Sequence, residues 1–99
     1  KFWATASIMA AYYEILNVSA NWLIKKGIKK NIANNYISEL FLSLSQDAVN
    51  KKSQGFKKLV ADSQTPKGLN MQVLNELKRG KFYSKFIKAM DNINRRVSN

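Results

Sequence analysis

Ser63-Gln64-Thr65-Pro66-Lys67-Gly68-Leu69-Asn70 is the stretch that divides this 99-residue chain. It contains the only proline of the sequence and one of its four glycines. Pro66 fixes its own φ, lacks an N–H and disfavours helical backbone at the residue before it. Gly68 permits a positive φ. Because apolar residues recur with helical spacing on both sides, the stretch predicts a turn between two helical halves.

The residues that follow the turn, from Asn70 to Leu77, have the spacing of a helix. The free N–H groups and the dipole at a helix N-terminus favour a bound anion. A plainer interpretation is that the stretch only connects two helices, with Thr65 or Asn70 as the N-cap of the second. The residues alone leave both interpretations open.

Two long helices are predicted before the turn. The first runs from about Ala4 to Lys26 and is followed by Gly27, the usual kind of residue at a helix C-terminus. Its apolar residues lie on nearly every face, which predicts burial on most sides. At ~1.5 Å per residue it would be about 34 Å long. A domain of this size has a radius of gyration of about 13 Å, so the helix predicts a partner that covers it.

The second long helix is expected from Lys30 or Asn31 to Lys52, on an apolar stripe of period near 3.6. A short helix precedes the turn, and Gly80 separates two further helices after it, so the remaining ranges are about Phe56–Asp62, Leu69–Lys78 and Phe82–Val97. No stretch alternates in the way typical of a strand. The predicted class is all-α: a helical bundle of two long helices, a short helix and two further helices.

The composition argues against several kinds of site. The chain has no cysteine and no histidine, so it lacks a disulfide framework, thiolate metal ligands and the commonest general base. Its six carboxylates are scattered along the predicted helices: Glu14, Glu39, Asp47, Asp62, Glu76 and Asp91. We therefore expect no metal site and no catalytic residue in this chain, which excludes a self-contained hydrolase or metalloenzyme.

The net charge of +11 raises nucleic acid or an acidic membrane surface as a partner. Four basic pairs fall at the ends of predicted helices, where cations complement the helix dipole: Lys25-Lys26, Lys51-Lys52, Lys78-Arg79 and Arg95-Arg96. Two more, Lys29-Lys30 and Lys57-Lys58, flank helix starts or loops instead. Much of the excess charge is interpreted as lysine-rich surface, so we expect no membrane partner and no specific nucleic-acid role.

The chain begins at Lys1, without methionine and inside a sequence that already looks helical. We interpret it as a fragment of a longer protein. No targeting signal is visible, and polar residues interrupt the apolar N-terminal run before it reaches the ~20 residues of a membrane span. A cytoplasmic location is expected.

The order of these features resembles the C-terminal dimerisation domain of the pyrroline-5-carboxylate reductase family, from about Thr5 to Arg96. The segments that resemble the family are Ala11-Tyr12, Gly27-Ile28, Phe56-Lys57-Lys58-Leu59-Val60, Gln64-Thr65-Pro66-Lys67-Gly68-Leu69-Asn70 and Gly80-Lys81-Phe82. The resemblance implies one helical dimerisation and substrate-binding domain over residues 1–99, with two copies interlocked through the long helices as a homodimer.

In that family an upstream Rossmann domain binds NAD(P)H, and hydride passes from the nicotinamide to the carbon of a cyclic imine. The resemblance thus implies that the parent protein is an oxidoreductase of proline biosynthesis that reduces a cyclic imine or small carbonyl. This chain lacks the nucleotide-binding domain and is expected to be inactive alone. Such chemistry needs mainly positioning and charge complementarity from the protein, which suits a chain without histidine or cysteine.

The resemblance also implies that the turn holds the carboxylate of the substrate, and the implied substrate-binding residues are Thr65, Lys67, Gly68, Leu69 and Asn70. Lys67 stands where the family has its first loop glycine, and either offers a positive charge to a carboxylate or points to solvent. Leu69 and Asn70 stand where the family has a small residue and a substrate-contacting threonine. Asn70 keeps a hydrogen-bond donor, but these departures leave the substrate open.

Two hypotheses of other classes remain beside the reductase. One is a helical dimerisation scaffold without reductase activity, and the other is a basic helical nucleic-acid-binding module. A G-x-G-x-x-G segment upstream of Lys1 in the parent open reading frame would favour the reductase over both, because that segment binds the pyrophosphate of a dinucleotide.

Overall fold

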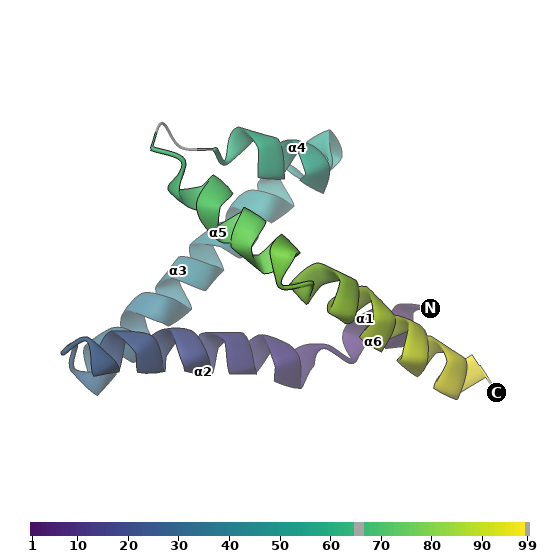
Figure 1. Ribbon diagram of the computed structural model, residues 1–99, viewed down its shortest axis with the longest axis horizontal. Helices are drawn as coiled ribbons and strands as arrows, with labels where there is room; N and C mark the ends of the chain where they lie inside the picture. The colour runs from purple at the N-terminus through teal and green to yellow at the C-terminus, as the bar shows by residue number, and fades with distance from the viewer. Residues whose placement is uncertain (65–66, 99) are drawn as a thin grey trace. The chain divides into compact units, whose positions relative to one another are not determined.

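The computed structural model describes residues 1–64 and 67–98, and every regular element in these ranges is helical (Figure 1). The elements are α1 (Phe2–Ala6), α2 (Met9–Lys25), α3 (Lys30–Asn50), the 3₁₀ turn η1 (Lys52–Gln54), α4 (Phe56–Asp62), α5 (Leu69–Arg79) and α6 (Phe82–Ser98). The predicted all-α class is confirmed. The interlocking of two copies stays a prediction.

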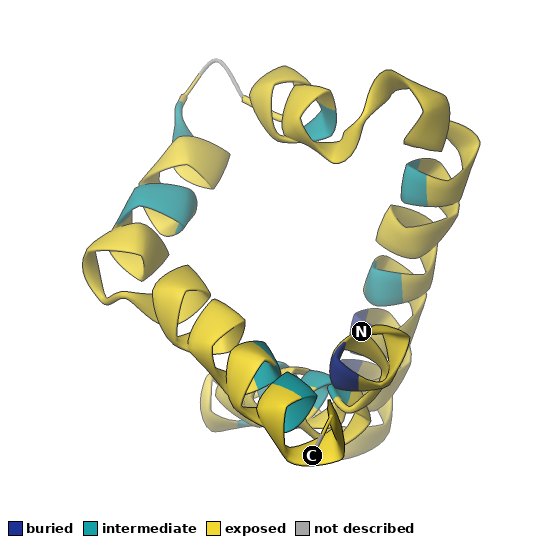
Figure 2. Cartoon of the chain, turned by 90° about the vertical axis from the view of Figure 1, so that its right-hand side faces the viewer, coloured by how far each residue is buried: buried dark blue, intermediate teal, exposed yellow. Residues whose placement is uncertain are grey.

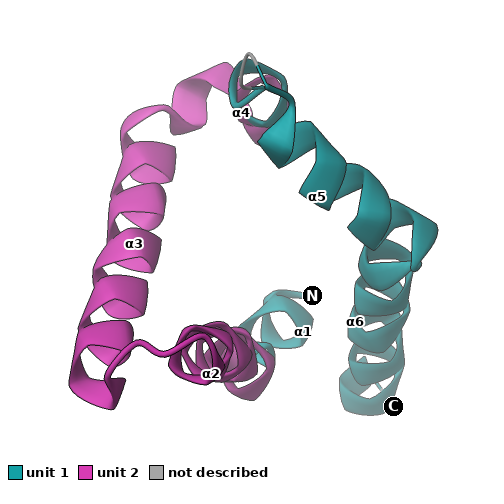
Figure 3. Ribbon diagram, turned by 60° about the vertical axis from the view of Figure 1, so that its left-hand side comes forward, with its two compact units in different colours: residues 1–8, 60–99 teal, residues 9–59 magenta. Residues whose placement is uncertain are grey.

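The chain folds into two compact units, which are coloured separately in Figure 3. One unit consists of residues 9–59 and contains α2, α3 and η1. The other consists of residues 1–8 and 60–99, and in it α6 packs against both α1 and α5. The short helix α4 spans the boundary between the units. The first residues of the chain therefore pack with its last helix rather than with the helix that follows them.

The first long helix differs from its prediction because it is interrupted at Ser7 and Ile8. The Ser7 hydroxyl donates a hydrogen bond of 2.8 Å to the carbonyl oxygen of Trp3, four residues earlier. The backbone leaves helical values at Ser7, the C-cap of α1, with φ of −79° and ψ of 12°. The continuous helix predicted over residues 4–26 is therefore wrong, and α2 begins only at Met9.

The second long helix ends two residues before its predicted terminus. Its C-cap is Lys51, whose ammonium forms an ion pair with the Asp47 carboxylate one turn earlier, at 3.3 Å. The 3₁₀ turn η1 follows and ends at Gly55, with φ of 88°. This left-handed value favours glycine, which explains why the chain changes direction here before α4.

The contact between α2 and α3 forms the core of the unit over residues 9–59. Ala20 of α2 and both Ala33 and Ile37 of α3 are buried. Further along the same contact, the rings of Tyr12 and Phe41 meet edge to face with their centroids 6.1 Å apart. Aromatic pairs of this kind contribute about 0.5–1.5 kcal/mol beyond the area they bury. Small side chains thus bring the two helices together, and the aromatic pair extends the contact along them.

Most large apolar side chains are exposed in the single chain, and Figure 2 shows that exposed residues predominate along the described helices. On α2, Ile15, Val18 and Trp22 recur at three- and four-residue steps, on the side of the helix away from the buried Ala20. Trp22 alone is 60% exposed. The prediction that this helix has more apolar surface than its own domain covers is confirmed.

Replacement of Ala33 by leucine tests the close contact of α2 with α3. Ala33 has no exposed surface, and added bulk in a packed site typically costs about 1–3 kcal/mol. We expect Ala33→Leu to lower the free energy of unfolding by that amount, measured by urea denaturation with far-UV circular dichroism. Asn35→Leu adds a leucine at an exposed position of the same helix and should change stability by less than about 0.5 kcal/mol. Equal stabilities of the two variants would contradict the described packing.

Candidate functional site

The turn between α4 and α5 is the candidate site, and Gly68 fixes its geometry. Gly68 is the N-cap of α5, with φ of 69° and ψ of 20°, in the left-handed region. Its carbonyl oxygen accepts the first helical hydrogen bond, from the N–H of Gln72 at 2.9 Å. A Cβ placed here would meet no atom within 4 Å. The glycine is therefore favoured by backbone conformation rather than by lack of space.

Asn70 links the two sides of this turn. Its side-chain Nδ2 donates a hydrogen bond of 2.7 Å to the backbone carbonyl oxygen of Ser63, seven residues earlier. The amide thus ties the start of α5 to the residue that follows α4. The alternative in which Asn70 is the N-cap of α5 is wrong, because Gly68 occupies that position and makes no side-chain capping bond.

The start of α5 has the features that favour an anion. Its N-cap, Gly68, has no side chain to make a capping bond, and its first turn has no acidic residue, while its dipole places positive potential there. Lys67 is exposed directly before Gly68. Leu69, the first residue of the helix, is 61% exposed. A carboxylate that approaches this end meets backbone N–H groups, one ammonium group and an apolar side chain.

Four of the five predicted substrate-binding residues, Lys67 to Asn70, lie consecutively at this helix start. The fifth, Thr65, lies outside the described residues, as does Pro66. The structure thus places the described candidates at one helix end, and their role as ligands of a substrate stays a prediction.

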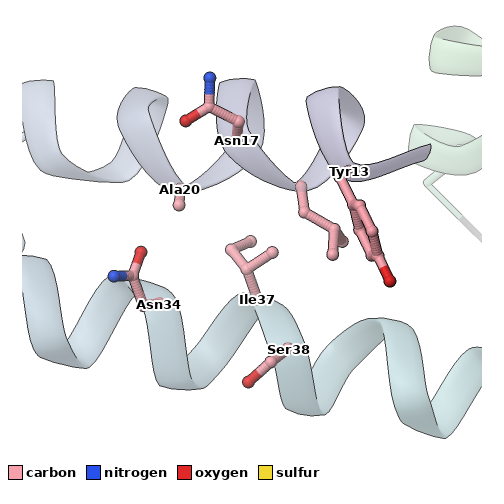
Figure 4. Close-up of a pocket in the computed structure, with 7 residues that line it drawn as sticks. Tyr13, Asn17, Ala20, Asn34, Ile37 and Ser38 are labelled. Carbon is pink, nitrogen blue, oxygen red and sulfur yellow. The ribbon is translucent and has the colours of Figure 1, made fainter. Parts of the chain in front are cut away.

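A groove that the sequence did not predict lies between α2 and α3, within the unit over residues 9–59 (Figure 4). It has a volume of about 260 Å³ and no charged residue in its lining, which consists of Tyr13, Leu16, Asn17, Ala20, Asn34, Ile37 and Ser38. In Figure 4, Ala20 and Ile37 point toward each other across it. The small side chain of Ala20 opposite Ile37 is the one sequence signal for this groove. The groove has no nucleophile–base pair and indicates no catalysis.

Within residues 1–64 and 67–98, no three carboxylates come together in a group that would hold a metal ion. In the same ranges, no helix has both the length and the apolar character needed to cross a membrane.

The helical order, the glycine-capped turn before α5 and the uncovered apolar surface of α2 and α3 agree with a known family. The family model for pyrroline-5-carboxylate reductase dimerisation matches residues 3–99. The chain belongs to this family. The resemblance inferred from the sequence is confirmed over essentially the whole chain. No match was found among curated proteins or among solved structures.

Loss of the Asn70 amide tests the link across the turn of this dimerisation domain. A typical intramolecular hydrogen bond contributes about 0.5–1.5 kcal/mol to stability, so Asn70→Ala should lower the free energy of unfolding by an amount in that range. Gln72→Ala, two residues later on the same helix and exposed, should be nearly neutral. Hydrogen exchange of the α5 amides should show the same contrast. Equal protection in the two variants would show that Asn70 does not hold the turn.

Proposed function

We propose that this chain is the dimerisation and substrate-binding domain of an NAD(P)H-dependent reductase that acts on a cyclic imine or small carbonyl compound. The observation that supports the proposal most directly is the family match over residues 3–99. The nucleotide cofactor would be bound mainly by a separate Rossmann domain of the parent protein. The present chain would contribute the partner contact and the anion-binding turn.

The proposed homodimer is supported by the apolar side chains that the single chain leaves exposed on its long helices. Large contiguous apolar patches on proteins mark interaction sites, and both long helices expose such side chains. On α3 they include Tyr36, Leu42 and Leu44, which are 57%, 61% and 58% exposed. Ile15 and Val18 add to them on α2. A second copy of the same chain supplies matching apolar surface, and an obligate interface of this kind buries more than about 2,000 Å².

The substrate-binding part of the proposal rests on the start of α5. A carboxylate is held there by N–H groups and by the helix dipole, without any residue that must change its protonation state. An amide nitrogen has two hydrogens, and the bond to Ser63 uses one hydrogen of Asn70 Nδ2. Asn70 can therefore hold the turn closed and donate to a bound carboxylate at the same time. The hydride comes from the cofactor, so this domain only positions the substrate.

A charge placed at Val18 of α2 tests the homodimer. We expect the wild-type chain to sediment as a dimer at micromolar concentration. A carboxylate buried without a partner in an interface is strongly unfavourable, so Val18→Glu should shift the chain to a monomer. Asn35→Glu makes the same change in charge at an exposed polar position of α3 and should leave the dimer intact. A wild-type monomer, or a Val18→Glu dimer of unchanged affinity, would contradict the proposal.

Removal of the Lys67 charge tests the anion site in the full-length parent protein. An exposed ion pair contributes about 0.2–1 kcal/mol, so Lys67→Gln should raise the KM for a carboxylate-bearing cyclic imine by up to about fivefold. The KM for a cyclic imine without a carboxylate should not change, and neither should the Tm of the dimer. Lys85→Gln, an exposed substitution in α6, is the matched control. Equal effects on both substrates would argue against charge recognition at the turn, and absence of reductase activity in the parent would contradict the function itself.

A further inference from the structure

The turn between α2 and α3 is the most concentrated site of charge in the unit over residues 9–59. Lys25 is the last residue of α2 and Lys26 follows it, Lys29 is the N-cap of α3 and Lys30 its first residue, and all four are exposed. Gly27 lies between the pairs with φ of 100° and turns the chain back within a few residues. We call these four residues, with Gly27 and Ile28 between them, the lysine turn.

No negative charge of this unit lies close to the lysine turn along the chain. From residue 15 to residue 38 the sequence has no aspartate and no glutamate. In the described part of the chain, none of the four lysines forms an ion pair. Four ammonium groups therefore raise one another's electrostatic energy at this end of the hairpin, and only salt screens them.

Favourable interactions with a helix dipole account for only part of the charge in the lysine turn. Lys25 lies in the last turn of α2, where a cation is favourable. Lys29 is the N-cap of α3 and Lys30 its first residue, where the dipole makes a cation unfavourable. The first turn of α3 has no acidic residue to compensate. The pair thus lies at a helix start, as expected from the sequence, and not at a helix C-terminus.

Exposed apolar side chains lie beside the lysines. Trp22 comes one turn before them, and the Lys26 ammonium sits 5.3 Å from the centroid of its ring. Ile28, at the centre of the lysine turn, is 40% exposed. Tryptophan prefers the boundary between lipid and water, where its ring is half buried and its N–H stays hydrated. Lysine residues at the same depth keep their ammonium groups at the headgroups.

We propose that the lysine turn docks the domain on the surface of a membrane that contains anionic phospholipid. The four ammonium groups contact lipid phosphates and carboxylates, while the Trp22 ring and the Ile28 side chain enter the interfacial region. The contact is peripheral, in agreement with the lack of a membrane-crossing helix among the described residues. It replaces the sequence-based expectation of no membrane partner, which rested on the basic pairs at helix C-termini and gave no role to Lys29 and Lys30.

Two features favour lipid over nucleic acid. The lysine turn contains no arginine, the residue that makes bidentate contacts to phosphate and stacks on bases. It presents an aliphatic side chain, Ile28, at its centre, and a nucleic-acid backbone offers no apolar surface for it. Lysine is depleted in protein–protein interfaces, so the proposed homodimer would use Ile15 and Val18 of α2 and leave Trp22 and the lysine turn outside.

Vesicle binding tests the proposal with the intact chain in its own oligomeric state. Each lysine near an anionic surface contributes about 1 kcal/mol, or roughly a fivefold gain in binding. We expect the chain to co-sediment with vesicles of phosphatidylcholine that contain about one-third phosphatidylserine, and not with pure phosphatidylcholine vesicles. Replacement of Lys25, Lys26, Lys29 and Lys30 by glutamine should reduce the partition coefficient by roughly several hundredfold. Raised salt should weaken wild-type binding in the same direction.

Four substitutions elsewhere provide the matched control. Lys78, Arg79, Lys85 and Lys88 lie on α5 and α6, and their replacement by glutamine removes the same charge from the other unit. This control variant should bind anionic vesicles nearly as the wild type does. Circular dichroism and sedimentation of both variants establish that helix content and oligomeric state are unchanged. Equal losses in the two variants would show that net charge alone, rather than the lysine turn, sets the affinity, and would overturn the proposal.

Tryptophan fluorescence tests the depth of the contact. Trp3→Phe leaves Trp22 as the single tryptophan, and its emission should shift to the blue when anionic vesicles are added. An emission maximum that vesicles do not change would show that Trp22 stays outside the lipid, and would contradict the proposed contact. Binding to RNA or duplex DNA that depends on the same four lysines, with no binding to anionic vesicles, would replace lipid by nucleic acid as the partner.

Discussion

The feature on which the rest of the structure depends is that the single chain leaves most of its large apolar side chains exposed. Within the described residues, the buried hydrophobic side chains are Ala4, Ala20, Ala33 and Ile37, three of which are alanines. A core of this kind buries little area, since alanine contributes far less than leucine or phenylalanine. The long helices nevertheless have ample apolar residues, but these lie on faces that no other segment of the chain covers. Membership of a dimerisation family agrees with the proposal that a second molecule covers these faces.

The small core also affects how the turn between α4 and α5, the candidate site, is held in place. A large core would hold the α4–α5 turn by side-chain packing, whereas here a hydrogen bond from Asn70 to Ser63 connects the two sides of the turn. The proposed anion binding would depend on the backbone, which the left-handed N-cap at Gly68 sets at the start of α5. A site formed by backbone groups tolerates side-chain replacement. Lys67 stands where the family has glycine and Asn70 where it has threonine, and both residues are compatible with the proposed anion binding.

Apolar periodicity and the positions of glycine predicted the helices well, because Gly27 and Gly55 take the positive φ that glycine favours where a helix ends. The interruption at Ser7 was missed because no glycine or proline marks it, although α1 packs against α6. Four of the predicted site residues were placed together by adjacency in sequence. The bond from Asn70 to Ser63 spans seven residues and depends on the path of the turn, which no spacing rule gives.

The positions of the basic residues in the helices are more informative than the net charge of the chain. A net charge of +11 spread over helix C-termini needs no partner, because each cation is stabilised by its own helix. The C-terminal ends of α2, α5 and α6 fit this pattern, with Lys25, Lys78-Arg79 and Arg95-Arg96 in their last turns. The start of α3 does not, because Lys29 and Lys30 lie at the positive end of the dipole. This unfavourable charge at the start of α3 is the feature of the lysine turn that the proposed contact with an anionic membrane surface would offset.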